Sequence, residues 1–122
     1  MTDREWQAID SLAKDEWESF AQKVKAECEH MASVACMDLR YEETSTSLTI
    51  QRFDDGSALK VLRLWYDAAV PRIICQCLNP LENKTSITFR LHGGRLLYVF
   101  GNVNTPVREI ILRLTMCLTG QI

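Results

Sequence analysis

One histidine and two arginines stand around a glycine pair, and their residue types suit ligand binding or proton transfer. Arg90 and His92 alternate along an expected strand that stops at Gly93 and Gly94, and Arg95 follows the turn. An imidazole can act as a general base, and guanidinium groups bind carboxylates and phosphates. Polar residues also flank many turns without any such role. We therefore predict a ligand-binding role for Arg90, His92 and Arg95 and assign no catalytic residue.

The sequence contains five cysteines, an odd number without regular spacing. They are Cys28, Cys36, Cys75, Cys77 and Cys117. Cys75 and Cys77 are two residues apart on an expected strand, so their thiols point to the same side. No pair has the spacing of a zinc site, no Cys-x-x-Cys motif is present, and cysteine often packs as a small apolar side chain. We expect reduced thiols, with Cys75 and Cys77 in the core, and neither a metal nor a cofactor.

The sequence lacks the motifs of common enzyme classes. No serine or cysteine lies in a nucleophile-elbow pattern, and neither a phosphate-binding glycine loop nor a dinucleotide fingerprint occurs. The acidic pairs at 42–43 and 54–55 fall in expected turns, where a solvated loop is a simpler interpretation than a catalytic or calcium-binding pair. Because no pair of titratable residues points to a reaction, an enzyme of unknown class is the third of our functional hypotheses.

Several arginines and two aromatic residues could together form a surface for nucleic acid. They are Arg63, Arg72, Arg90, Arg95, Arg108, Tyr98 and Phe100. A basic sheet face with aromatic rings can stack single-stranded bases. The segment 95–101 lacks the motif of an RNA-recognition sheet, and Tyr98 alternates with Leu96 on the expected core face. The net charge is only −2, so bulk charge indicates no polyanion either, and we do not expect a nucleic-acid partner.

Apolar side chains exceed what one-sided surface helices need. Trp6 and Ile9 lie near the start of the first expected helix, and Leu112 and Met116 lie off the apolar stripe of the second. Tryptophan and methionine are enriched at protein interfaces. A crowded core shared by both helices accounts equally well for the same residues. We name Trp6, Ile9, Leu112 and Met116 as interface candidates.

A long amphipathic helix is the first element expected to position these residues. From Trp6 to Met31, apolar residues recur every three or four positions with charged residues between them. Thr2 and Glu5 form a capping-box pattern at its start. Unbroken to residue 31, the helix would be roughly 43 Å long, which exceeds the width of a compact domain of this size. Either the helix breaks within residues 13–16, or its first turns pack against another chain.

After residue 32 the pattern changes to alternating polar and apolar positions, rich in β-branched and aromatic types. We expect strands at 34–41, 48–53, 59–66, 73–78, 85–92 and 95–101. Turns at 54–56 and at Gly93 and Gly94 favour hairpins, and Pro80 ends a strand because proline lacks an amide hydrogen for the ladder. The apolar Ile87 should face the core from the cleanest of these strands.

A second helix is expected after Thr105 and Pro106, which suit an N-cap and a first helical position, and Gly120 would end it. The fold class is therefore α+β: a long N-terminal amphipathic helix, an antiparallel meander of five to six strands forming a curved sheet, and a C-terminal helix packed on the sheet. With 122 residues, 47% of them apolar, we expect a single domain, residues 1–122.

The sequence has no apolar run at its start and none long enough to span a membrane, so we expect a cytoplasmic protein without a membrane partner. Our first functional hypothesis is a noncatalytic protein-interaction module whose helices form the contact. The module self-associates as a homodimer, or it binds an unknown protein partner. The second is a domain that binds an apolar or anionic small molecule in a pocket between the curved sheet and a helix.

Overall fold

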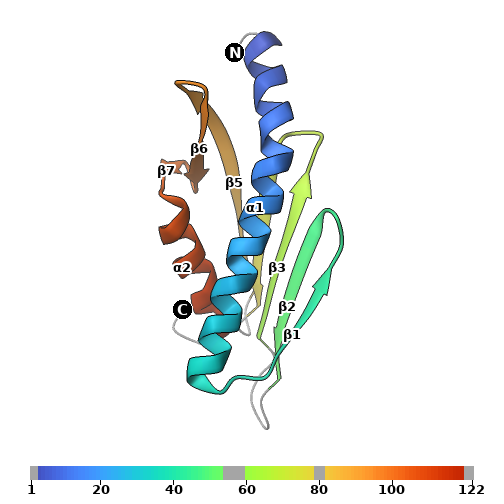
Figure 1. The fold of residues 1–122 in the computed structure, drawn as a ribbon, viewed down its shortest axis with the longest axis vertical. Coiled ribbons are helices and arrows are strands. Elements are labelled where there is room, and N and C mark those ends of the chain that lie inside the picture. The colour runs from blue at the N-terminus through green and yellow to red at the C-terminus, as the bar shows by residue number, and fades with distance from the viewer. Residues whose placement is uncertain (1–2, 54–59, 79–81, 120–122) are drawn as a thin grey trace.

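The computed structural model describes residues 3–53, 60–78 and 82–119, and that part contains one helix, seven strands and a second helix in chain order. The elements are α1 (Asp3–Ala35), β1 (Leu39–Glu43), β2 (Ser47–Arg52), β3 (Lys60–Asp67), β4 (Arg72–Leu78), β5 (Glu82–His92), β6 (Arg95–Phe100), β7 (Val103–Asn104) and α2 (Val107–Thr119). Figure 1 shows α1 crossing in front of the strands, with α2 beside its C-terminal half. The predicted α+β class is confirmed.

The strands form one sheet in which each strand pairs antiparallel with its neighbours in the chain. The expected meander is therefore confirmed, and the strand order follows the chain order. The sheet has seven strands rather than five to six, because the two-residue strand β7 pairs with the end of β6. Gly93 and Gly94 have φ values of 58° and 76°, which a two-residue hairpin turn requires.

Helix α1 is continuous through residues 13–16, which rules out the break that was one of the two expected arrangements. Ile9, Ala13 and Trp17 are buried because their spacing places them on the helix face toward the sheet. Its 33 residues make a rod of about 50 Å. Figure 1 shows the first turns of α1 extending past the strands. The side chain of Trp6, the Thr2 cap, the turn at 54–56, Pro80 and Gly120 lie outside the described part of the chain.

The core lies between the two helices and one face of the sheet. Its fully buried side chains include Phe20, Val24, Leu48, Ile50, Leu62, Leu64, Ile73, Ile87, Ile110 and Leu118. In β5, Phe89 is buried as well, while Thr88 and Arg90 are exposed, as the alternation predicted. The opposite face of the sheet is covered by neither helix, because both helices contribute to the same hydrophobic cluster.

Two long-range hydrogen bonds fix α1 against the sheet side of the molecule. Trp17 Nε1 donates to the carbonyl oxygen of Ser45 at 3.0 Å, and its ring stacks on Tyr66. Tyr98 Oη donates to Glu16 Oε2 at 2.7 Å from β6. Polar groups on a mostly apolar helix face specify one register of the helix on the sheet, because a shifted register would leave buried groups unpaired.

The end of α1 differs from the sequence prediction, which began a strand at residue 34. The helix continues past that point, and β1 begins only at residue 39. Cys36 follows the helix with a φ of 54°, and Met37 N donates to Ala32 O at 3.1 Å. This is a Schellman cap with a residue other than glycine in the left-handed position. The β-branched Val34 favours extended structure and therefore predicts a strand, but the cap at Cys36 decides where the helix ends.

Replacing Cys36 by glycine is expected to raise the free energy of unfolding by about 1 kcal/mol, because glycine adopts a positive φ without the steric cost of a Cβ atom. Urea denaturation followed by circular dichroism measures the change. Cys36→Ala is the matched control: it removes the same exposed thiol and keeps the Cβ. Equal midpoints for the glycine and alanine variants would contradict the assignment of strain to this residue.

The start of α2 also differs from the expectation. Thr105 was predicted to cap the helix, but its hydroxyl donates to the carbonyl oxygen of Val103 at 2.9 Å. The helix begins at Val107, and the carbonyl of Pro106 accepts the amide of Ile110 at 3.1 Å. The hydroxyl instead stabilises the turn that leads from β7 into the helix.

Candidate functional site

Arg90, His92 and Arg95 lie together at the hairpin end of β5 and β6. His92 is directly opposite Arg95 in the ladder, and Arg90 precedes His92 by two residues on the same face. All three are exposed. Arg90 borders a hollow next to Ile9, whereas Arg95 borders a different one next to Glu16. The structure thus brings the three residues near one another without enclosing them around a common cavity, and their ligand-binding role stays a prediction.

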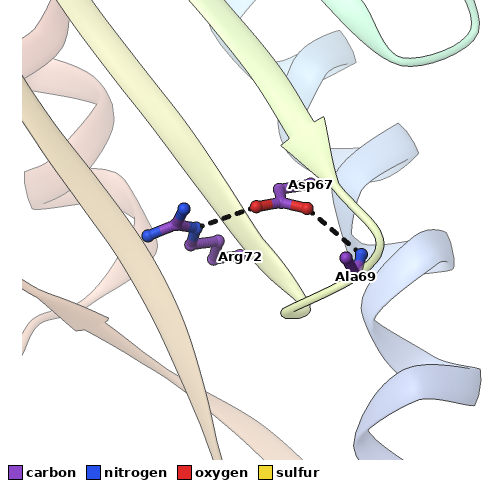
Figure 2. Close-up of polar contacts among 3 residues, drawn as sticks. All are labelled: Asp67, Ala69 and Arg72. Atoms are coloured by element: carbon purple, nitrogen blue, oxygen red, sulfur yellow. Dashed lines mark hydrogen bonds and ion pairs between the residues drawn. The ribbon is translucent and has the colours of Figure 1, made fainter.

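The strand arginines considered for nucleic acid lie on the opposite face of the sheet from the two aromatic residues, and Arg108 lies on α2. Arg63 and Arg90 are on the face without helices, while Tyr98 is buried on the core face. Arg72, on the helix-free face, is paired: its Nε lies 3.1 Å from Asp67 Oδ2. Figure 2 shows that Asp67 also accepts the backbone amide of Ala69, at 3.1 Å, so this carboxylate closes the turn between β3 and β4. Arg72 therefore has a local structural partner.

The outer face of α2 carries two exposed apolar side chains one helical turn apart. Leu112 is 43% exposed and Met116 is 41% exposed. Both were named as interface candidates from the sequence because they lie off the buried stripe. The other described candidate, Ile9, is 3% exposed and packs in the core, so it contributes almost no surface. We call Leu112 and Met116 the α2 ridge.

A groove borders the α2 ridge on the side of α1. It has a volume of about 620 Å³, and its lining includes Lys23 and Glu27 from α1 and Arg108, Ile111 and Leu112 from α2. We call it the α1–α2 groove. It lies where the first half of α2 runs beside the C-terminal half of α1 (Figure 1). No sequence pattern indicated it, since it depends on how far apart the two helices lie.

A second hollow lies on the other side of the α2 ridge, between α2 and the inner face of β4 to β6. Its volume is about 340 Å³, and its lining includes Cys75, Cys77, Phe100, Arg113, Met116 and Cys117. We call it the sulfur hollow. The ridge residue Met116 borders it, so the two concave regions flank the same exposed strip of helix.

A disulfide joins Cys77 on β4 to Cys117 on α2, with their Cα atoms 5.9 Å apart. The expectation of five reduced thiols is therefore wrong for this pair. Cys28, Cys36 and Cys75 are free. Sequence reasoning missed the bond because the two cysteines are 40 residues apart and meet only when α2 packs back on the sheet.

The buried titratable groups have pKa values far from neutrality. Burial raises the pKa of the Cys28 and Cys75 thiols to about 12. Burial also raises the pKa of Tyr41 to about 12. The pKa of Tyr98 is raised well above its usual value by burial and by its hydrogen bond to Glu16. These groups stay protonated at neutral pH, so none is adjusted for acid–base exchange there.

The described residues 3–53, 60–78 and 82–119 contain no cluster of three or more histidine, cysteine, aspartate or glutamate side chains placed to hold a metal ion. Nor does that part of the chain contain a helix with the length and apolarity needed to cross a membrane.

The fold and its two concave regions define a small α+β domain with a helix-covered antiparallel meander. Comparison with protein-family models, with curated proteins and with solved structures finds no match to this chain. The functional argument therefore depends on the surfaces themselves.

Proposed function

We propose that this protein is a noncatalytic interaction module that self-associates through the α2 ridge and the α1–α2 groove. The observation that carries the proposal is the pair Leu112 and Met116, exposed on consecutive turns beside a groove of about 620 Å³. Side-chain ridges of one helix pack into the grooves of another, and this region offers both.

Symmetry supports a second copy of the chain as the partner. A two-fold contact uses the same patch on both copies, so the patch must be complementary to itself. The groove is bordered by Lys23 and Arg108, which are basic, and by Glu27, which is acidic. Because both signs of charge are present, a second copy turned by 180° can set Glu27 against a basic residue of its partner. A partner with only one sign of charge fits this patch less well.

The size of the molecule is compatible with such a contact. The chain exposes 7510 Å². A specific interface of standard size covers roughly 800 Å² on each partner, which is about a tenth of that surface. A contact of standard size therefore leaves about nine tenths of the surface uncovered.

Replacing Leu112 by glutamate is expected to weaken the dimer at least about tenfold, because a carboxylate would lie at the centre of an apolar contact and opposite its own symmetry mate. Light scattering after size exclusion, from micromolar to millimolar concentration, measures the change. The matched control is Val70→Glu in the β3–β4 turn, a 49% exposed valine distant in the chain from either helix. A strict monomer for the wild-type chain over this range would remove the proposal, and so would equal effects of the two variants.

A second candidate function is binding of a small apolar or anionic molecule in the sulfur hollow. Its volume of about 340 Å³ lies at the lower end of the usual range for ligand pockets. Its lining is mostly apolar, and Arg113 can orient an anionic group. Native mass spectrometry of the chain purified from its source tests this, because a retained ligand adds a defined mass that disappears on denaturation. Loss of that mass in Leu114→Trp, which fills the hollow, would place the ligand there.

We retain a cytoplasmic location as part of the proposal. Disulfides in that compartment are usually transient and serve catalysis or redox sensing. The state of Cys77 and Cys117 should then follow the redox state of the cell. Alkylation of the denatured chain directly after lysis would label three thiols when the bond is present and five when it is reduced.

A further inference from the structure

We propose that the Cys77–Cys117 bond is a thiol–disulfide exchange site for small anionic thiols, which enter the sulfur hollow and attack the sulfur of Cys77. The proposal concerns this hollow alone and does not depend on the α2 dimer. Four features of the described residues support it: unequal exposure of the two cysteines, a hydrogen-bond acceptor for the released thiol, a third cysteine that does not attack the bond, and a nearby cation.

Exposure differs between the two cysteines of the bond. Cys77 is partly exposed, whereas Cys117 has no exposed surface. Both residues line the sulfur hollow, whose volume of about 340 Å³ is large enough for a molecule of a few heavy atoms. An exchange reaction proceeds at the sulfur that the attacking thiolate can reach. The incoming thiol should therefore bond to Cys77 and release Cys117.

The released sulfur already has a hydrogen-bond acceptor. Cys117 Sγ lies 3.3 Å from the carbonyl oxygen of Val61 on β3. As a thiol, Cys117 can donate to this oxygen, so the reduced form leaves no buried donor without a partner. A sulfur position that suits both the bonded and the reduced state favours a reversible bond over a purely structural one.

The third cysteine of the hollow does not compete for the bond. Cys75 precedes Cys77 by two residues on the same face of β4 and lines the same hollow. Burial raises the pKa of its thiol to about 12, and only a thiolate attacks a disulfide. Cys75 therefore stays protonated at neutral pH, and exchange requires a thiol from outside.

Charge selects the kind of thiol. Of the residues described as lining the sulfur hollow, only Arg113 is charged. Its Nη2 contacts Glu109 Oε1 at 2.7 Å, but Glu109 is not part of the lining, so an anion in the hollow lies nearer the guanidinium than the carboxylate. A single cation a few ångströms from a ligand charge at a solvated site contributes roughly 0.7 kcal/mol, or about threefold in rate.

The reaction balances without a further oxidant. The incoming thiolate forms a bond to Cys77 Sγ, the Cys77–Cys117 bond breaks, and its electron pair leaves on Cys117 Sγ, which takes a proton from solvent. A second thiol molecule then attacks the mixed disulfide. It leaves Cys77 as a thiol and carries the oxidised small molecule away as its symmetrical disulfide. Helix α2 then loses its covalent attachment to β4.

The test compares three thiols of similar size on the full oxidised chain: 2-mercaptoethanesulfonate, 2-mercaptoethanol and cysteamine, which are anionic, neutral and cationic. Each rate is divided by the rate of the same thiol with a small neutral disulfide, so that intrinsic reactivity cancels. Acid quenching and peptide mass mapping locate the mixed disulfide. We expect it on Cys77, with the anionic thiol about threefold faster than the neutral one and the cationic thiol slower.

Arg113→Met should equalise the three normalised rates, whereas the matched control Arg108→Met, on the groove side of α2, should leave the preference intact. Cys75→Ser should leave the rates unchanged. A mixed disulfide on Cys117, equal rates for the three thiols in the wild-type chain, loss of exchange in Cys75→Ser, or five free thiols in air-purified protein would each overturn the proposal.

Discussion

Replacing Phe20 by alanine is expected to lower the free energy of unfolding by about 3–5 kcal/mol, a large fraction of the stability of a domain of this size. Phe20 has no exposed surface and lies in the middle of α1. Its ring centroid is 5.8 Å from that of Tyr98, which in turn packs edge-on against Phe89. Loss of the ring would leave a cavity and remove one of the contacts that join α1 to β5 and β6. Backbone hydrogen bonds between the strands hold the sheet in place, so it cannot move easily to fill this cavity.

Urea unfolding of Phe20→Ala followed by tryptophan fluorescence measures this loss. Leu12→Ala serves as the matched control, because Leu12 is on the same helix and is exposed, and it should cost less than about 1 kcal/mol. A loss at Phe20 no larger than the loss at Leu12 would show that α1 contributes little to the cooperative core.

Reduction of the Cys77–Cys117 bond is expected to lower the free energy of unfolding by about 4 kcal/mol. The bond closes a loop between cysteines that are 40 residues apart, and loops of that length restrict the unfolded chain by about this amount in the chain-entropy description. The folded state changes less, because the freed Cys117 thiol keeps Val61 O as its acceptor. The effect therefore arises chiefly in the unfolded chain.

Guanidinium unfolding with and without a dithiol reductant measures this effect. Cys77→Ser is the control variant: it cannot form the bond, so the reductant should leave its midpoint unchanged, close to that of the reduced wild-type chain. A wild-type midpoint that does not respond to the reductant would mean either that the bond does not form or that the unfolded chain is not restricted by it.

The local patterns of the sequence predicted most of the fold. Phe20 and Val24 recur with helical spacing, and both are buried in α1. In β5, Ile87 and Arg90 lie on opposite faces, as the period of two required. These predictions held because the burial of a helix stripe or of one face of a strand follows from local periodicity. Helix α1 is unbroken, and the other arrangement left open, in which its first turns pack against another chain, stays a prediction.

The boundaries that were missed depend on backbone geometry that residue types do not reveal. Residue 34 was placed in a strand because valine favours extended structure, yet the helix continues until Cys36 adopts a positive φ. Thr105 has the residue type of an N-cap but uses its hydroxyl for the preceding turn. Strand β7 has only two residues, too few for any periodic pattern.

The candidate sites depended far more on tertiary structure. Leu112 and Met116 were named from their position off the apolar stripe, and they are exposed, whereas Ile9 was named with them and is buried by the sheet. Arg113, which borders the sulfur hollow, was not singled out, since nothing local distinguishes it from other surface arginines.

The sequence by itself determined the α+β class, the two amphipathic helices and the antiparallel meander, because each follows from contacts between residues close in the chain or from period alone. Only the tertiary structure decided that Cys77 meets Cys117, that both helices cover one face of the sheet, and that a groove and a hollow flank α2. Those features join segments far apart in sequence. They are set by how the helices pack on a twisted sheet, a geometry that depends on the whole core and not on any local pattern.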